Sequence, residues 1–394
     1  MDAKLITKER HLDELCHHVD RAGMVSLDFE FIPERTYFPV LCLVQACVEG
    51  TPYIVDPLAL RDLGELWKRV ANPEIKCIFH AGSQDLELAY GLSGLVPKNI
   101  FDTQIAAGFA GYGYSAGYRK LLNQILDVNI PKTESFSDWQ ARPLTDAQID
   151  YAVNDVIHLE PLYENILEEL ERRGRLDWAF EECLHYEEEG TYNKDRSREF
   201  FRVKGSNTLT PRGLAILREV WGWRDETARE LNKPPRTILA DNVLIEVCRR
   251  PPASVQALGK MRGIRPDQVR HYGDAILDAV RDGQSVPSDQ CPTWPSGRAP
   301  SKDELLMGDF IYVILKFLAN DLDLAAEHLA TRDELQAIVR GYMEGRPERT
   351  EDVRLLKGWR FDVAGERIVA MLDGRDIHVK VRKQRRGLKL ELTD

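Results

Sequence analysis

The sequence lacks any apolar run of about 18 residues or more, so it predicts no transmembrane helix. It also lacks a CxxC pair, and its seven cysteines are scattered singly along the chain. An odd number of scattered cysteines argues against both a disulfide framework and a zinc ribbon. The N-terminus, MDAKLITKERHLDEL, is too charged for the apolar core of a secretory signal. These absences make a cytoplasmic protein without a membrane partner the expectation.

Positive charge is also in deficit, because the formal net charge is −11. That sum alone disfavours nucleic acid as a partner, but the distribution of charge matters more. The first 150 residues are acidic, residues 210–290 are slightly basic, and Lys and Arg gather between Arg375 and Lys389. The sequence therefore offers acids where a metal could be held and basic residues elsewhere.

A chain of 394 residues is long enough for two or three domains. Residues 24–31, 41–48 and 52–56 are strand-like and closely spaced, which predicts an antiparallel meander. Helical patterns then alternate with short apolar runs such as 75–79. This mixture predicts an α/β fold for the first domain, residues 1–186.

The remaining chain is predicted to be mainly helical and to be interrupted by connecting segments. Prolines punctuate the helical patterns and mark their ends. Two segments near the C-terminus, 377–381 and 388–392, alternate apolar and polar residues and predict a β-hairpin with a basic tip. The expected division is a connector at 187–208, a helical domain at 209–286, a proline-rich linker at 287–300 and a C-terminal domain at 301–394, helical with the terminal hairpin.

The stretch SLDFEF at 26–31 has the pattern of a strand but carries two carboxylates. Because side chains alternate along a strand, Asp28 and Glu30 share one face and Leu27 and Phe29 share the other. Two acids so close together repel each other unless something positive lies between them. Taken alone, such a pair is more often a solubility feature of an edge strand.

Two further segments supply acids in a matching pattern. Asp85 lies in the motif HAGSQDLE, in the first turn of a predicted helix. A capping box at 145–148 opens another helix, in which Tyr151 and Asp155 are spaced i, i+4 and share a face. Each feature alone is more often a helix-start charge or a surface pair. Together, four carboxylates and a phenol suit two hard cations, Mg²⁺ or Mn²⁺, that promote in-line phosphoryl displacement.

These motifs resemble those of ribonuclease D, in the DEDD superfamily of 3′–5′ exonucleases and its tyrosine subgroup. The matching stretches are LDFEF, FHAGSQDLELAYG and YAVND, the last preceded by KTESFSDWQARPL. The resemblance covers most of residues 20–165, and residues 210–285 resemble an HRDC domain. It implies a ribonuclease H-like mixed-sheet exonuclease domain followed by helical HRDC-type domains.

The resemblance also implies a role for each acid. Asp28 would bridge two divalent cations, Glu30 and Asp155 would complete the site that activates water, and Asp85 would hold the ion near the leaving oxygen. Tyr151 would orient the water or help to deprotonate it. The implied enzyme is a monomeric 3′–5′ exoribonuclease, a hydrolase that releases nucleoside 5′-monophosphates. Its implied substrate is RNA with a free 3′ end, tRNA precursors and other structured RNAs among them.

Aromatic and basic residues near the motifs are candidate contacts to the RNA. Phe31, Tyr37 and Phe38 could stack on bases, because stacking tolerates any sequence, and packing in the core is the alternative. The HRDC-like segment and the basic C-terminal tip could hold the RNA backbone, although that tip could also be a solvated hairpin. Residues expected to contact the substrate backbone are Lys132, Trp139 and Arg142, with structural packing as the alternative for Trp139.

Two other acids compete for the metal-binding roles. Asp56 precedes a proline at the end of a predicted strand, so we interpret it as a turn residue. Asp102, in the stretch FDTQ, is expected to cap a helix N-terminus. Pro161 is predicted to kink or interrupt the helix that carries Asp155.

Two other functions compete with the exoribonuclease. A 3′–5′ DNA exonuclease of the proofreading or helicase-linked type would use the same acids. The sequence contains neither a polymerase segment nor the GxxxxGK[ST] motif of a helicase. A catalytically silent nucleic-acid-binding scaffold would not need all four acids and the tyrosine, and all five are present.

Overall fold

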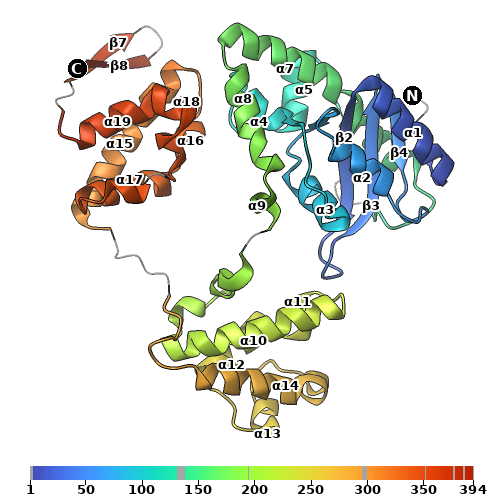
Figure 1. The fold of residues 1–394 in the computed structure, drawn as a ribbon, viewed down its shortest axis with the longest axis vertical. Coiled ribbons are helices and arrows are strands. Elements are labelled where there is room, and N and C mark those ends of the chain that lie inside the picture. The colour runs from blue at the N-terminus through green and yellow to red at the C-terminus, as the bar shows by residue number, and fades with distance from the viewer. Residues whose placement is uncertain are drawn as a thin grey trace.

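The chain folds into an α/β part and two helical parts, which can be followed along the chain in Figure 1. Among the described residues, no helix is both long and apolar enough to cross a bilayer. The computed structural model describes residues 3–130, 138–193, 195–294, 300–350, 352–375, 378–384 and 387–393.

One mixed sheet of six strands forms the centre of the α/β part. Its strands are β1 (Lys4–Ile6), β2 (Met24–Ile32), β3 (Val40–Val48), β4 (Thr51–Val55), β5 (Lys76–Phe79) and β6 (Ile100–Asp102). Their order is β1-β4-β3-β2-β5-β6. The pairs β2–β3 and β3–β4 are antiparallel, which confirms the predicted meander, and the other three pairs are parallel.

Helices cover both faces of this sheet. Leu27 and Phe29 of β2 belong to a core shared with three helices on one face, α1 (Glu9–Ala22), α2 (Gly64–Val70) and α3 (Ser83–Ser93). On the other face α6 (Asp146–Ile157) packs Ala152 and Val153 against β3 and β4. Because side chains alternate, Asp28 and Glu30 project toward α6.

The helix that follows α6 begins almost at once. After His158, α7 (Leu159–Arg173) starts with Pro161 in its first turn, where a missing N–H does no harm. The predicted interruption at this proline is therefore confirmed. The other helices of the α/β part are α4 (Thr103–Phe109), α5 (Tyr118–Leu126), α8 (Leu176–Cys183) and the 3₁₀ turn η1 (Leu184–Glu187).

The segment predicted as a connector contains short helices and also contributes to a core. Phe200 and Val203 are buried against the helical part that follows. Short 3₁₀ turns have too few residues to show a clear hydrophobic period, so the sequence pattern did not predict this packing. The elements are α9 (Glu189–Tyr192), η2 (Arg196–Arg202), η3 (Ser206–Thr208), α10 (Pro211–Glu230), α11 (Pro235–Ile238), α12 (Asp241–Arg249), α13 (Val255–Gly259) and α14 (Pro266–Ser285).

The C-terminal part is helical and ends in the predicted hairpin, whose two strands pair antiparallel. The basic residues expected at the hairpin tip, 385 and 386, lie outside the described residues. The elements are α15 (Lys302–Asp321), α16 (Ala326–Leu329), α17 (Arg332–Met343), η4 (Pro347–Thr350), η5 (Arg354–Leu356), α18 (Gly358–Arg360), the π-helical η6 (Phe361–Gly365), α19 (Glu366–Leu372), β7 (His378–Gln384) and β8 (Gly387–Thr393).

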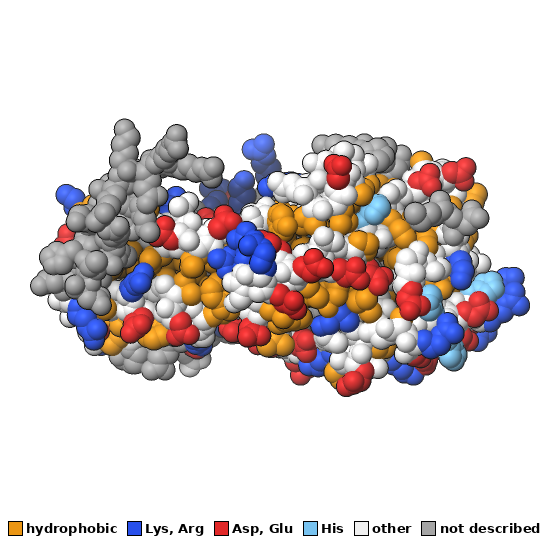
Figure 2. All heavy atoms as spheres, turned by 90° about the horizontal axis from the view of Figure 1, so that it is seen from above, with side chains coloured by type: hydrophobic (Ala, Val, Ile, Leu, Met, Phe, Trp, Pro, Cys, Tyr) orange, Lys and Arg blue, Asp and Glu red, His pale blue; other side chains and the backbone are white. Residues whose placement is uncertain are grey.

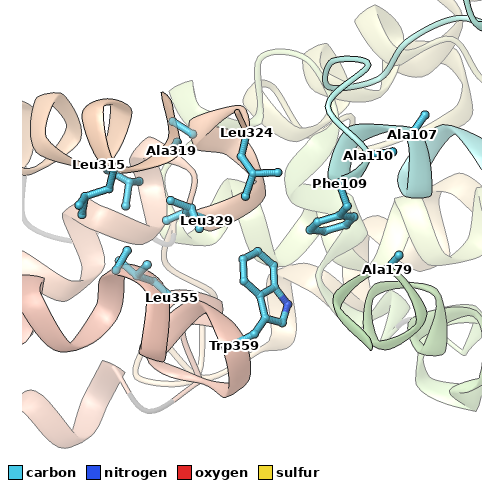
Figure 3. Packing of buried hydrophobic residues seen from close by; sticks show 14 of the residues in the cluster. Ala107, Phe109, Ala110, Ala179, Leu315, Ala319, Leu324, Leu329, Leu355 and Trp359 are labelled. Atoms are coloured by element: carbon cyan, nitrogen blue, oxygen red, sulfur yellow. The ribbon is translucent and has the colours of Figure 1, made fainter. Parts of the chain in front are cut away.

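This C-terminal part shares one apolar core with the α/β part. Phe109, at the end of α4, faces Trp359 in Figure 3, and their ring centroids are 5.5 Å apart. A side chain at Gly108 would collide with the buried His328, so the close approach requires glycine. The two parts are therefore joined by continuous packing.

Candidate active site

Strand β2 places its two acids beside a third. Strand β5 pairs with β2 only as far as Ser26, so the later amides of β2 on that side are free of the ladder. The amide of Phe29 instead donates a 3.0 Å hydrogen bond to Oδ1 of Asp85. This bond fixes Asp85 between the positions of Asp28 and Glu30 along the strand.

The turn that delivers Asp85 to this position is held by Asp102. The backbone of Ala81 has a positive φ of 58°, and its amide and that of Gly82 each donate a 3.0 Å bond to the Asp102 carboxylate. The hydroxyl of Tyr186 donates a third bond, also 3.0 Å long. Asp102 caps α4 as predicted, and in addition it stabilises the turn before α3.

Helix α6 delivers the remaining two groups from the opposite side. The predicted capping box between Thr145 and Gln148 is formed. Ala152 and its neighbours anchor the helix to the sheet, so Tyr151 and Asp155 face the acids of β2.

All five predicted catalytic residues line one pocket. Carboxylate oxygens of Asp28, Glu30 and Asp155 lie within 4.8 Å of one another. Asp85 and Tyr151 complete the group. Among the described residues, no Lys or Arg lines this pocket. Its other lining residues are Phe29, Phe31, His80, Ala81, Ser83, Gln84 and Tyr118.

Burial raises the pKa values of all four acids, and repulsion by the other acids of the pocket adds to this for Asp28 and Glu30. The pKa of Glu30 rises to about 8, and those of Asp85 and Asp155 rise to about 7, in each case mainly through burial. Burial and the neighbouring acids raise the pKa of Asp28 well above its usual value. Burial also raises the pKa of Tyr151, so its phenol is a neutral hydrogen-bond donor. Carboxylates so crowded fit divalent cations, which supply the missing positive charge.

Phe31 was predicted either to stack on bases or to pack in the core, and it lies at the boundary between the core and the acidic pocket. It packs against the apolar core of the sheet and also lines the acidic pocket. It further lines an adjoining apolar hollow with Pro33, Phe38, Leu88 and Leu92. Phe38 is 51% exposed, so its ring remains available to a ligand.

Tyr37, predicted to contact the substrate, joins the α/β part to α10. Its hydroxyl donates a 3.0 Å bond to Asp225 and accepts a 2.6 Å bond from Arg196. The guanidinium of Arg229 lies over its ring, 5.6 Å from the centroid. The sequence could not show this, because Asp225 is 188 positions away.

Arg142 and Trp139, also predicted to contact the substrate, have structural roles. All the N–H groups of Arg142 are used, by Asp56 and by backbone carbonyls that include Cys42. Trp139 is 5% exposed and packs in the core beside Tyr151, so the packing alternative holds. Asp56 also forms the predicted turn. Lys132 lies outside the described residues.

One charged residue near the site has no sequence signal. Arg119 lies in the first turn of α5 and lines a second hollow, which shares Tyr151 and Asp155 with the acidic pocket. Its stretch, GYRKLL, matches none of the motifs, so only the fold reveals its position.

Comparisons with known proteins agree with this architecture. Residues 3–171 match the family model described as 3′–5′ exonuclease, and residues 213–280 match the HRDC domain. The ribonuclease D of Gluconacetobacter diazotrophicus is 36% identical over 95% of this chain and 94% of its own. That of Granulibacter bethesdensis is 34% identical, with 94% and 92% covered.

A solved structure extends the likeness to three dimensions. The RNase D of Escherichia coli, an exoribonuclease involved in structured RNA processing, superposes with a TM-score of 0.83 and 28% identity. The match covers 95% of this chain and all of the other. Full-length relatives and both family models thus agree, and the chain belongs to the ribonuclease D family of 3′–5′ exoribonucleases.

Proposed function

We propose that this chain is a monomeric two-metal-ion exoribonuclease that trims the 3′ ends of structured RNA, tRNA precursors among them. The observation that carries the proposal is the cluster of Asp28, Glu30 and Asp155 oxygens within 4.8 Å, with Asp85 and Tyr151 in the same pocket. Its product would be a nucleoside 5′-monophosphate.

The four acids suit the binding of two Mg²⁺ or Mn²⁺ ions. Asp28, Glu30 and Asp155, whose oxygens lie close together, would hold these ions with Asp85 from the same pocket. Bound ions would acidify the attacking water and neutralise charge on the phosphoryl group. The raised pKa values support this, because the acids are poorly accommodated without cations.

Tyr151 would orient the attacking water. Burial raises the pKa of its phenol, so the phenol keeps its proton and would donate a hydrogen bond to that water. Trp139 packs at a ring-centroid distance of 5.8 Å and restricts the position of the Tyr151 ring.

The substrate would enter from the apolar hollow. Phe31 is common to the hollow and the acidic pocket, so a strand can pass from one to the other. Phe31 and the exposed Phe38 would stack on bases near the 3′ end. Charges of both signs are interspersed on the face shown in Figure 2, so electrostatic binding of RNA would rely on local basic groups.

A time course on a 3′-extended tRNA precursor tests the proposal. Wild-type protein should release mononucleotides with Mg²⁺ or Mn²⁺ and should stop when EDTA is added. Asp28→Asn should abolish release. The matched control is Asp127→Asn, an exposed position of positive φ that asparagine tolerates. Full activity of Asp28→Asn would contradict the site assignment.

Two comparisons separate the remaining functions. Equal digestion of single-stranded RNA and DNA would favour a general exonuclease. Calorimetric titration with Mn²⁺ would identify a silent scaffold if no ion bound.

A further inference from the structure

A single guanidinium lies beside the acidic pocket. Arg119 lines the second hollow, whose wall it shares with Tyr151 and Asp155, and these two residues also line the acidic pocket. Among the described Lys and Arg residues, Arg119 alone lines either of the two hollows. The other residues around the second hollow are Ile130, Ala147, Asp150 and Asn154.

The charge of Arg119 acts on the reacting groups. It lowers the pKa of Tyr151 and of Asp155, against the larger effect of burial. Within the described part of the chain, its guanidinium forms no ion pair or hydrogen bond. A guanidinium placed there can therefore still take an anionic ligand.

The anion that suits this position is a phosphate. Two divalent cations would balance the four carboxylates, and a phosphodiester would then bring further negative charge to the pocket. Guanidinium binds phosphate through two parallel N–H bonds, a geometry that an ammonium lacks. We infer that Arg119 binds the phosphate of the 3′-terminal nucleotide, which leaves as the 5′-phosphate of the product. This inference rests on the proposed function.

Binding of the product measures this contact without turnover. In calorimetry with Mn²⁺ present, Arg119→Gln should weaken 5′-AMP binding roughly ten- to a hundredfold, the size of a charge-assisted contact. Arg119→Lys should lose less, because it keeps the charge. Adenosine, which has no phosphate, should bind equally to all variants.

Lys120 provides the matched control. It is the next residue of α5, is exposed, and lines neither hollow. Lys120→Gln removes the same charge and should leave 5′-AMP binding unchanged. In a plot of the logarithm of RNA affinity against the logarithm of salt concentration, the slope should become shallower by about 1, which corresponds to one phosphate contact, in Arg119→Gln but not in Lys120→Gln.

Several outcomes would overturn the inference. In one, Arg119→Gln binds 5′-AMP as tightly as the wild type does. In another, Arg119→Gln loses as much affinity for adenosine as for 5′-AMP. In a third, its affinity for Mn²⁺, measured without nucleotide, falls by the same factor as its affinity for 5′-AMP. The proposed function fails separately, if wild-type protein releases no mononucleotides from RNA. Thermal unfolding of each variant shows whether it is folded.

Discussion

The two faces of strand β2 have opposite physical characters. On one face Leu27 and Phe29 are almost fully buried in an apolar core. On the other face Asp28 and Glu30 meet two more acids, and all their pKa values are raised. The period of two that creates a core on one side therefore also gathers carboxylates on the other.

This difference has a thermodynamic consequence for the metal-free protein. Carboxyl groups in an unfolded chain titrate near pH 4, whereas those of the folded pocket titrate near 7 and 8. Between these values the folded state binds more protons than the unfolded state. The free energy of unfolding should therefore decrease as the pH rises from about 4 to about 8. One face stabilises the fold, and the other reduces stability until cations bind.

The largest effect should come from the apolar face. Phe29→Ala should lower the free energy of unfolding by about 3–5 kcal/mol, because Phe29 packs edge-on against Trp67 and Phe79. Urea unfolding measures this loss. Phe38→Ala, at an exposed ring, should change stability by less than about 0.5 kcal/mol. Equal losses would mean that the apolar face is not the main support of the strand.

The second largest effect should come from the acidic face and concerns how its affinity for metal ions changes with pH. Each ion displaces protons from carboxyl groups whose pKa values lie near 7 and 8. Displacement of one proton per ion makes affinity for Mn²⁺ rise on the order of a hundredfold from pH 6 to 8. Calorimetry in buffers of different ionisation enthalpy should also detect proton release. A flat profile would show that the acids are already ionised without metal.

Most substitutions of buried residues lower stability, but Asp28→Asn should raise the stability of the metal-free protein. Asp28 is ionised in the unfolded chain but its pKa is raised on folding, which costs free energy that a neutral asparagine does not, so the variant should raise the stability of the metal-free protein by about 1–2 kcal/mol while it abolishes activity. Thermal unfolding in EDTA at pH 8 measures the gain, with Asp127→Asn as the control. The gain should shrink at pH 5, where the wild-type acids are protonated. A lower stability than wild type at pH 8 would refute the comparison between the faces.

What could be predicted from the sequence depended on local pattern. Alternation in SLDFEF assigned Asp28 and Glu30 to one face, and the capping box set the start of the helix that bears Asp155. The N-cap role of Asp102 also follows from its neighbours in sequence. Each of these inferences needed only a few adjacent residues.

The sequence did not reveal the partners of side chains that are bound by residues far along the chain. Tyr37 binds Asp225, and Arg142 binds Asp56, 86 positions away. Both residue types also suit RNA, so composition could not separate the two roles. The position of Arg119 near the active site could be recognised only from the fold, in which α5 and α6 line the same hollow.

The smallest effect concerns a polar residue beside Asp28. Gln45 is the cross-strand partner of Asp28 and is 0% exposed, and among the described residues neither its amide nitrogen nor its oxygen has a hydrogen-bond partner. A buried amide without partners costs free energy that an apolar side chain of similar volume does not. Gln45→Met should therefore stabilise the metal-free protein by about 1 kcal/mol in urea unfolding.

Leu43→Met is the control for that substitution, because Leu43 lies on the same strand and face and is fully buried. It should destabilise slightly, by less than about 1.5 kcal/mol, since it only exchanges one apolar shape for another. Opposite signs for the two methionine variants would show that polar groups, and not imperfect packing, weaken the acidic face. A loss of stability in Gln45→Met would mean that the amide is satisfied in solution, and that the weakness of this face arises from its carboxylates alone.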